Sequence, residues 1–225
     1  MNEAIQRFVD ELAAEASVRG IVLFGSHARG NARPDSDADL LILGERDQFE
    51  MGFAERDGQK FELLYISEAV AIRYFLDHRD EAADFWQVAQ ILYDPDGAAA
   101  RAQDQAAQIL AEGKPRMDEA RRAWSRWASE DRLDAAAGMV EDDPATARLV
   151  LHERVIALTG AFFDVRGEWT PPTKRRTGRI ANLDPGLHAL LTAIYADGAS
   201  FADQLALARR MVPLIYDEAS VNNRR

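Results

Sequence analysis

The chain contains no cysteine, only four scattered histidines and no long apolar run. The absence of cysteine excludes disulfides and thiolate zinc sites, and it fits a cytoplasmic location. Because the four histidines are scattered along the chain, we do not expect a histidine-based metal site. No apolar run approaches the ~20 residues that span a bilayer, and the N-terminal residues lack the basic and apolar regions of a signal peptide. We therefore expect a cytoplasmic protein with no membrane partner.

Basic residues are also scarce relative to acidic ones, because the formal net charge is -11. Residues 1–97 hold 9 Lys or Arg and 20 Asp or Glu, whereas residues 98–225 hold 18 of each kind. A general nucleic-acid binder needs a basic surface, so this class is not expected. The acidic excess lies entirely in the first part of the chain, where it favours the binding of cations.

Two apolar runs at residues 21–24 and 40–43 are typical of buried strands. The segment 25–36 between them holds a Gly-Ser turn, the start of a short helix and a loop rich in helix breakers. The second strand opens with Asp37 and Asp39. Because strand side chains alternate between faces, these two carboxylates lie on the same face, about 7 Å apart.

This arrangement suits the handling of phosphates. Two acids side by side repel each other unless a cation lies between them, and Mg²⁺ is held by carboxylates together with substrate phosphates. Gly25 lets the backbone approach an anion closely, Ser26 adds a hydroxyl, and the amides that follow form a phosphate seat. A phosphate cradle beside a pair of metal ligands is the minimum equipment for phosphoryl or nucleotidyl transfer.

A third carboxylate stands in the next predicted strand, residues 59–67. Glu62 lies between apolar residues, where a charged group is costly unless it is paired. One interpretation makes Glu62 a third acid of the site, and the alternative places it on an edge strand facing water. Glu68 and Asp57 are weaker candidates for the same role.

The pattern Gly25-Ser26-x-Ala28-Arg29-Gly30, followed by Ser36-Asp37-x-Asp39-Leu40, resembles the signature of the polymerase-β-type nucleotidyltransferases, in particular their minimal branch. The resemblance implies transfer of a nucleoside monophosphate, expected to be AMP, from an NTP such as ATP to a hydroxyl acceptor, with release of pyrophosphate. The sequence does not identify the acceptor, which is a small molecule or a protein. The sequence is also compatible with an oligomer.

The resemblance also implies roles for single residues. Asp37 and Asp39 would hold two Mg²⁺ ions, and Glu62 would complete the metal site or accept the acceptor's proton. The family often has Asp at this third position, so Glu62 is a departure from its pattern. Gly25, Ser26, Arg29 and Ser36 are the expected nucleotide-binding residues around the turn.

The remaining pattern predicts an α+β chain with two domains. A small mixed-sheet nucleotidyltransferase domain is expected at residues 1–97, ending in the turn-forming residues 92–97. It includes a helix at 3–16, a loop or edge strand with a turn at 44–60, and mainly helix at 68–93. Apolar residues at helical spacing, Trp124 and Trp127 among them as core residues, predict an antiparallel helical bundle at residues 98–225.

The helical part resembles two known groupings. One is the fusion of a minimal nucleotidyltransferase to a HEPN-type domain, and the other is the antibiotic nucleotidyltransferases, whose helical half completes the acceptor pocket. A basic segment at 166–179 is predicted to be a loop between helices, and Lys174 within it is a candidate for binding the triphosphate or an acidic acceptor. A solvated loop is the alternative.

A rival function of another class remains open from the sequence. The chain could be a non-catalytic nucleotide-binding or protein-interaction module, a hypothesis that the Glu at position 62 keeps open. A toxin–antitoxin fusion, in which a tyrosine of a helical domain accepts AMP, is a third hypothesis.

Overall fold

The computed structural model describes residues 2–45 and 49–217. The chain divides into two compact units, Met1–Glu112 and Gly113–Arg225. In chain order, the elements of the first unit are α1 (Glu3–Ala13), β1 (Val18–Phe24), α2 (Gly25–Ala28), β2 (Ala38–Gly44), β3 (Glu50–Arg56), β4 (Gln59–Ile66), α3 (Glu68–Asp77), α4 (Arg79–Trp86), β5 (Gln90–Tyr93) and α5 (Ala98–Glu112).

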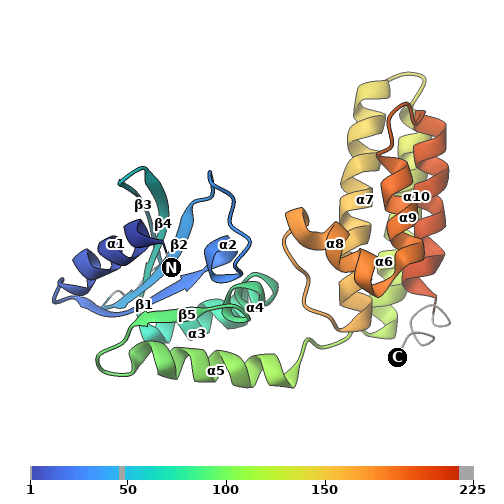
Figure 1. Ribbon diagram of the computed structural model, residues 1–225. Helices are drawn as coiled ribbons and strands as arrows, with labels where there is room; N and C mark the ends of the chain where they lie inside the picture. Colours follow the sequence, from blue (N-terminus) through green and yellow to red (C-terminus); the bar gives the residue numbers. More distant parts are fainter. Residues whose placement is uncertain (1, 46–48, 218–225) are drawn as a thin grey trace. The chain divides into compact units, whose positions relative to one another are not determined.

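The first unit is built on a five-stranded sheet with the order β3-β4-β2-β1-β5 (Figure 1). β2 and β4 run parallel, whereas the other neighbouring pairs are antiparallel. This mixed sheet with its helices confirms the predicted α+β fold class. β4 lies between β2 and β3, so Glu62 stands on an interior strand and not on an edge.

Helices cover both faces of the sheet. α1 begins after Asn2, whose side chain accepts a hydrogen bond from the Ala4 amide, and its buried stripe packs on one face. On the other face, a Cβ placed on Gly20 of β1 would lie 3.1 Å from the Ala99 Cβ of α5. The side chains of Phe24 in β1 and Phe85 in α4 pack there with ring centroids 4.4 Å apart.

Two segments of the first unit differ from the prediction or sharpen it. The stretch 44–60 contains edge strand β3 and a two-residue turn at Asp57-Gly58, a pair that tight hairpins favour, so the edge-strand alternative is confirmed. Residues 90–93, expected to be helical, form β5 instead and pair with β1. A run of three apolar residues, Ile91 to Tyr93, cannot be assigned to helix or strand by periodicity alone.

The division between the units falls later than the predicted boundary after Gly97. Helix α5 belongs to the first unit because Ala98, Ala99, Ala102 and Ala106 are buried in it. These alanines present a flat apolar strip to the sheet and α3. Turn-forming residues at 94–97 mark the end of a strand here and not the end of a domain.

The second unit is entirely helical in its described residues. Its elements are α6 (Glu119–Met139), α7 (Pro144–Arg166), α8 (Thr173–Leu183), α9 (Pro185–Ile194) and α10 (Phe201–Tyr216). A single core joins α6, α7, α9 and α10 through side chains such as Leu133, Phe162, Leu191 and Met211. In the ranges that the structure describes, no helix combines the length and apolar character needed to cross a lipid bilayer.

Two predictions for this unit are wrong. The segment 166–179 is not one long loop, because α8 starts at Thr173 and carries most of its basic residues. Trp124 and Trp127, predicted to be core residues, are 67% and 60% exposed on α6. The face of α6 that packs on α7 and α10 carries Ser129, Leu133 and Ala136 instead.

The boundary after Glu112 generates a test with two fragments. We expect residues 1–112 to unfold cooperatively in urea, because α5 covers one face of the sheet. A fragment of residues 1–97 exposes that face, and its free energy of unfolding should be lower by at least about 2 kcal/mol. Unfolding is followed by circular dichroism. If the two fragments have equal free energies of unfolding, the first unit ends at Gly97, as the sequence predicts.

Candidate active site

The site begins where β1 ends and the chain turns into α2. Gly25 has φ +67°, a conformation that side-chain-bearing residues rarely adopt. A Cβ placed on Gly25 would lie 1.7 Å from the Asp39 Oδ2 atom, far inside any real contact distance. The turn therefore requires glycine for two reasons, its backbone conformation and the close approach of the Asp39 carboxylate.

Strand register brings the acids together. Phe24, at the end of β1, pairs with Asp39 on β2, and Asp39 pairs in turn with Glu62 on the parallel strand β4. Alternation along the strands places Asp39 and Glu62 on the face opposite α1, and Asp37 lies directly before β2. One carboxylate oxygen from each of these three residues lies within 4.8 Å of the others. Asp37 is exposed, and the other two are half-buried.

Such a carboxylate cluster fits a hard divalent cation. Three negative charges at this spacing repel one another, and a cation among them removes the repulsion. All three donors are oxygens, the ligand type that Mg²⁺ and Mn²⁺ prefer over the nitrogen and sulfur ligands typical of zinc. Within the described residues, no second group of three or more such side chains comes together.

Residues 5–88 match the family model of the nucleotidyltransferase domain. This match spans β1, the Gly25-Ser26 turn and all three acids. The first unit thus carries the nucleotidyltransferase domain that its motif predicts, followed by a helical unit. The predicted HEPN-like character of that second unit stays a prediction.

Two further comparisons agree with this assignment. Over 51 residues, 21% of this chain, the sequence is 45% identical to a Methanocaldococcus jannaschii protein named "putative protein adenylyltransferase". The match covers 51% of that protein, so the chain spans about half the length of this curated relative. The fold is similar to a nucleotidyltransferase-like protein from Exiguobacterium sibiricum, with a TM-score of 0.51 and 15% identity over 95% of this chain and 73% of that one.

Arg29 of the nucleotidyltransferase domain has a structural partner. Its Nη2 atom donates to the Asp84 carbonyl oxygen at 2.5 Å and lies 2.9 Å from the Asp84 Oδ1 atom. Burial lowers the pKa of the Arg29 guanidinium from its ordinary value. The pair ties the end of α2 to α4, so Arg29 fixes the turn in place. Its predicted contact with a phosphate stays a prediction.

Ser36 holds the loop that leads into the acids. Its hydroxyl accepts a hydrogen bond from the Arg33 amide at 2.9 Å, and its carbonyl oxygen accepts one from the Gln59 side chain at 2.9 Å. The His27 Nε2 atom lies 3.4 Å from the same carbonyl oxygen. These contacts position Asp37, the next residue. Sequence reasoning missed Gln59 and His27, because only the folded loop brings them to Ser36.

The weaker acidic candidates are engaged elsewhere. Glu68 forms a bidentate ion pair with Arg101 at 2.9 Å, and Asp57 pairs with Arg7 at 3.0 Å. Neither belongs to the carboxylate cluster. Glu62 is therefore the third acid of the cluster.

An exposed aromatic side chain lies beside this third acid. Phe53 on β3 is the direct cross-strand partner of Glu62, so their side chains share one face of the sheet. Phe53 is 77% exposed. No signal along the chain pointed to Phe53, because β3 was predicted only as an alternative to a loop.

Lys174 belongs to the other unit. It is an exposed residue in the first turn of α8, among the basic residues of that helix. Its predicted role in binding a triphosphate or an acidic acceptor stays a prediction.

The contact between Gly25 and Asp39 can be tested with a matched glycine. Gly25→Ala should displace the Asp39 carboxylate and weaken Mn²⁺ binding about tenfold or more, as measured by an electron paramagnetic resonance titration. Gly30 has a similar φ of +73°, but a methyl group added there would meet no atom within 4 Å. Gly30→Ala should therefore carry the same backbone strain and leave the Mn²⁺ affinity unchanged. Equal affinities for the two variants would refute the contact.

Proposed function

We propose that the protein transfers a nucleoside monophosphate, AMP in the first instance, from an NTP to a hydroxyl acceptor and releases pyrophosphate. The observation that carries this proposal is the convergence of Asp37, Asp39 and Glu62 beside the Gly25 turn. A carboxylate cluster without the turn would suit many metal sites. A turn that seats phosphates next to the acids favours phosphoryl chemistry.

Each residue has a role in this reaction. The Gly25-Ser26 turn holds the β- and γ-phosphates, and Asp37 and Asp39 hold two Mg²⁺ ions. The bound metal supplies charge stabilisation for the attacking and leaving oxygens. A bond forms between the acceptor oxygen and the α-phosphorus as the bond to the β-phosphate oxygen breaks. Glu62 completes the metal site or accepts the proton that the hydroxyl loses.

Sheet order indicates the side from which the acceptor enters. In phosphoryl transfer the attacking and leaving oxygens are roughly in line with the phosphorus. The Gly25 turn follows β1, whereas Glu62 lies on β4, with β2 between them. With the leaving pyrophosphate at the turn, the acceptor approaches from the β4 side. Phe53 on β3 then stands beside the entering acceptor.

The identity of the nucleotide and acceptor rests on a relative. The Methanocaldococcus protein is named as a protein adenylyltransferase, which supports ATP as donor and a protein as acceptor. A small-molecule hydroxyl is the other acceptor class. A helical unit of the HEPN type would be compatible with a protein acceptor of the toxin–antitoxin kind.

A non-catalytic module that binds an NTP or a protein partner is the rival function, and Glu62, where the family often has Asp, keeps this rival open. A transferase and a module that binds an NTP both require binding of NTP with Mg²⁺, so NTP binding does not separate these two. Only the transferase releases pyrophosphate and forms an adduct that mass spectrometry detects on the acceptor.

Substitution of the acids tests the transferase directly. With ATP, Mg²⁺ and a cell extract as the source of acceptor, Asp39→Asn should lower the protein-dependent rate of pyrophosphate release by about 100-fold or more, because one metal ligand is lost. Glu62→Gln should lower it as well, and chelation of divalent metal should abolish it. A coupled pyrophosphate assay measures all three effects.

The matched control is Asp57→Asn, which removes an exposed carboxylate outside the cluster. Its rate should equal that of the wild-type protein. If the wild-type protein, given a cell extract as the source of acceptor, releases no pyrophosphate from any of the four NTPs above the rate without the protein, or if Asp39→Asn retains full turnover, the proposed function is wrong.

A further inference from the structure

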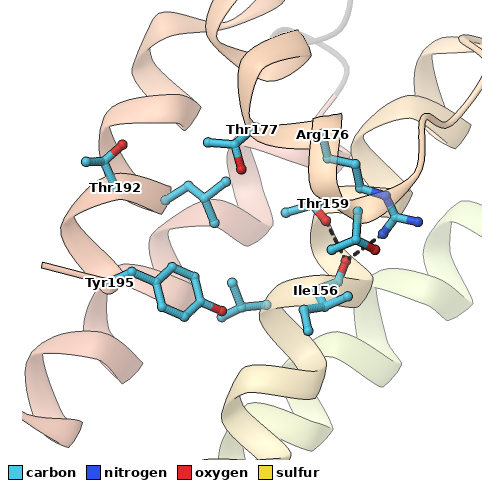
Figure 2. Close-up of a pocket in the computed structure, with 9 residues that line it drawn as sticks. Ile156, Thr159, Arg176, Thr177, Thr192 and Tyr195 are labelled. Atoms are coloured by element: carbon cyan, nitrogen blue, oxygen red, sulfur yellow. Dashed lines mark hydrogen bonds between the residues drawn. The ribbon is translucent and has the colours of Figure 1, made fainter. Parts of the chain in front are cut away.

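A pocket of about 490 Å³ opens in the second unit between α7, α8 and the end of α9 (Figure 2). Small-molecule sites in proteins have volumes of about 300–1,000 Å³, so this space suits a ligand of ordinary metabolite size. Val155, Ile156 and Leu191 give it aliphatic walls. These walls would desolvate the apolar body of a ligand.

Among the described residues that line the pocket, Arg176 is the one that carries a charge. Its Nε atom donates to the Pro171 carbonyl oxygen at 2.9 Å. Its Nη1 atom lies 3.4 Å from the Ile156 carbonyl oxygen (Figure 2). Both acceptors are neutral, and no carboxylate of the described residues pairs with this guanidinium. Arg176 is thus held in place with an unneutralised charge and further N–H groups available.

The charge of α8 strengthens this feature. The helix reads Thr-Lys-Arg-Arg-Thr-Gly-Arg-Ile-Ala-Asn-Leu, with four basic residues and no acidic one. This local excess of positive charge occurs in a protein whose net charge is -11. Among the basic residues of α8, Arg179 pairs with Glu168, and the positive charge that remains on the helix favours an anion over a cation in the pocket.

Polar groups complete the lining. The Thr177 hydroxyl extends from α8 toward the pocket (Figure 2) and has no hydrogen-bond partner in the described part of the chain. Tyr195, at the end of α9, is half-exposed and stacks on His152 with ring centroids 5.5 Å apart. The stack fixes the tyrosine ring as a rigid wall, which lowers the entropy lost when a ligand binds.

From these contacts we infer that the pocket binds a small organic anion with an apolar, ring-sized body and one anionic group. The anionic group, a carboxylate, sulfonate or phosphate, binds Arg176 and Thr177, and the body lies between the aliphatic walls and the Tyr195 ring. The pocket lies wholly within the second unit, so this proposal does not rest on the proposed transferase function.

Two dyes that differ by one anionic group test the proposal on the full-length protein. Anilinonaphthalene sulfonate has an apolar ring body and one sulfonate, and phenylnaphthylamine has the same rings without the sulfonate. We expect one sulfonate dye bound per chain, with an affinity about tenfold higher than that of the neutral dye. Fluorescence titration measures both affinities and the stoichiometry.

Three variants locate the dye. Arg176→Gln should lower the affinity for the sulfonate dye about tenfold and leave the neutral dye unaffected. Thr192→Trp, at an exposed position of the lining, should fill the pocket and remove binding of both dyes. Arg179→Gln is the matched control, because Arg179 lies on the same helix and pairs with Glu168 outside the lining.

Several results would overturn the proposal. The proposal is wrong if the sulfonate dye binds Thr192→Trp as tightly as it binds the wild-type protein. It is also wrong if Arg176→Gln and Arg179→Gln lower the affinity for the sulfonate dye by the same factor. Binding of many dyes without saturation, or equal affinity for the two dyes, would also contradict a built anion site. If Arg176→Gln proves unstable in thermal unfolding, Thr192→Trp decides the question alone.

Discussion

The structure of the candidate site depends on the contact between the Gly25 backbone and the Asp39 carboxylate. The space for a side chain at Gly25 is occupied by an Asp39 oxygen, so a larger residue at position 25 and the Asp39 carboxylate cannot both keep their places. This contact joins the two halves of the motif into one site. Three carboxylates also lie close together beside this contact, where their negative charges repel one another and the rest of the domain must hold them in place.

The surrounding structure keeps that arrangement rigid. Arg29 anchors the end of α2 to Asp84, and Ser36 ties the loop before Asp37 to Gln59. These contacts hold the turn and the loop on either side of the carboxylate cluster, whose three oxygens lie within 4.8 Å of one another. A site held in this way loses little entropy when a metal and a nucleotide bind.

The sequence predicted the parts of the site that depend on local spacing. Strand alternation and the Gly-Ser turn placed Asp37 and Asp39 correctly, because both follow from neighbours along the chain. The sheet order could not be predicted in this way, and it alone decides that Glu62 is interior and paired with Asp39. The end of the first unit was missed, because the alanine strip of α5 is equally compatible with a bundle helix. Trp124 and Trp127 follow a helical stripe, yet periodicity does not show which stripe the core selects.

The central claim is that the three carboxylates share divalent metal beside the glycine turn. A crystal of the protein grown with Mn²⁺ and a non-hydrolysable ATP analogue tests it most directly, through anomalous scattering from manganese. We expect anomalous peaks within bonding distance of Asp37, Asp39 and Glu62, with the triphosphate at the Gly25-Ser26 turn. Manganese bound elsewhere, or a triphosphate seated away from the turn, would contradict it.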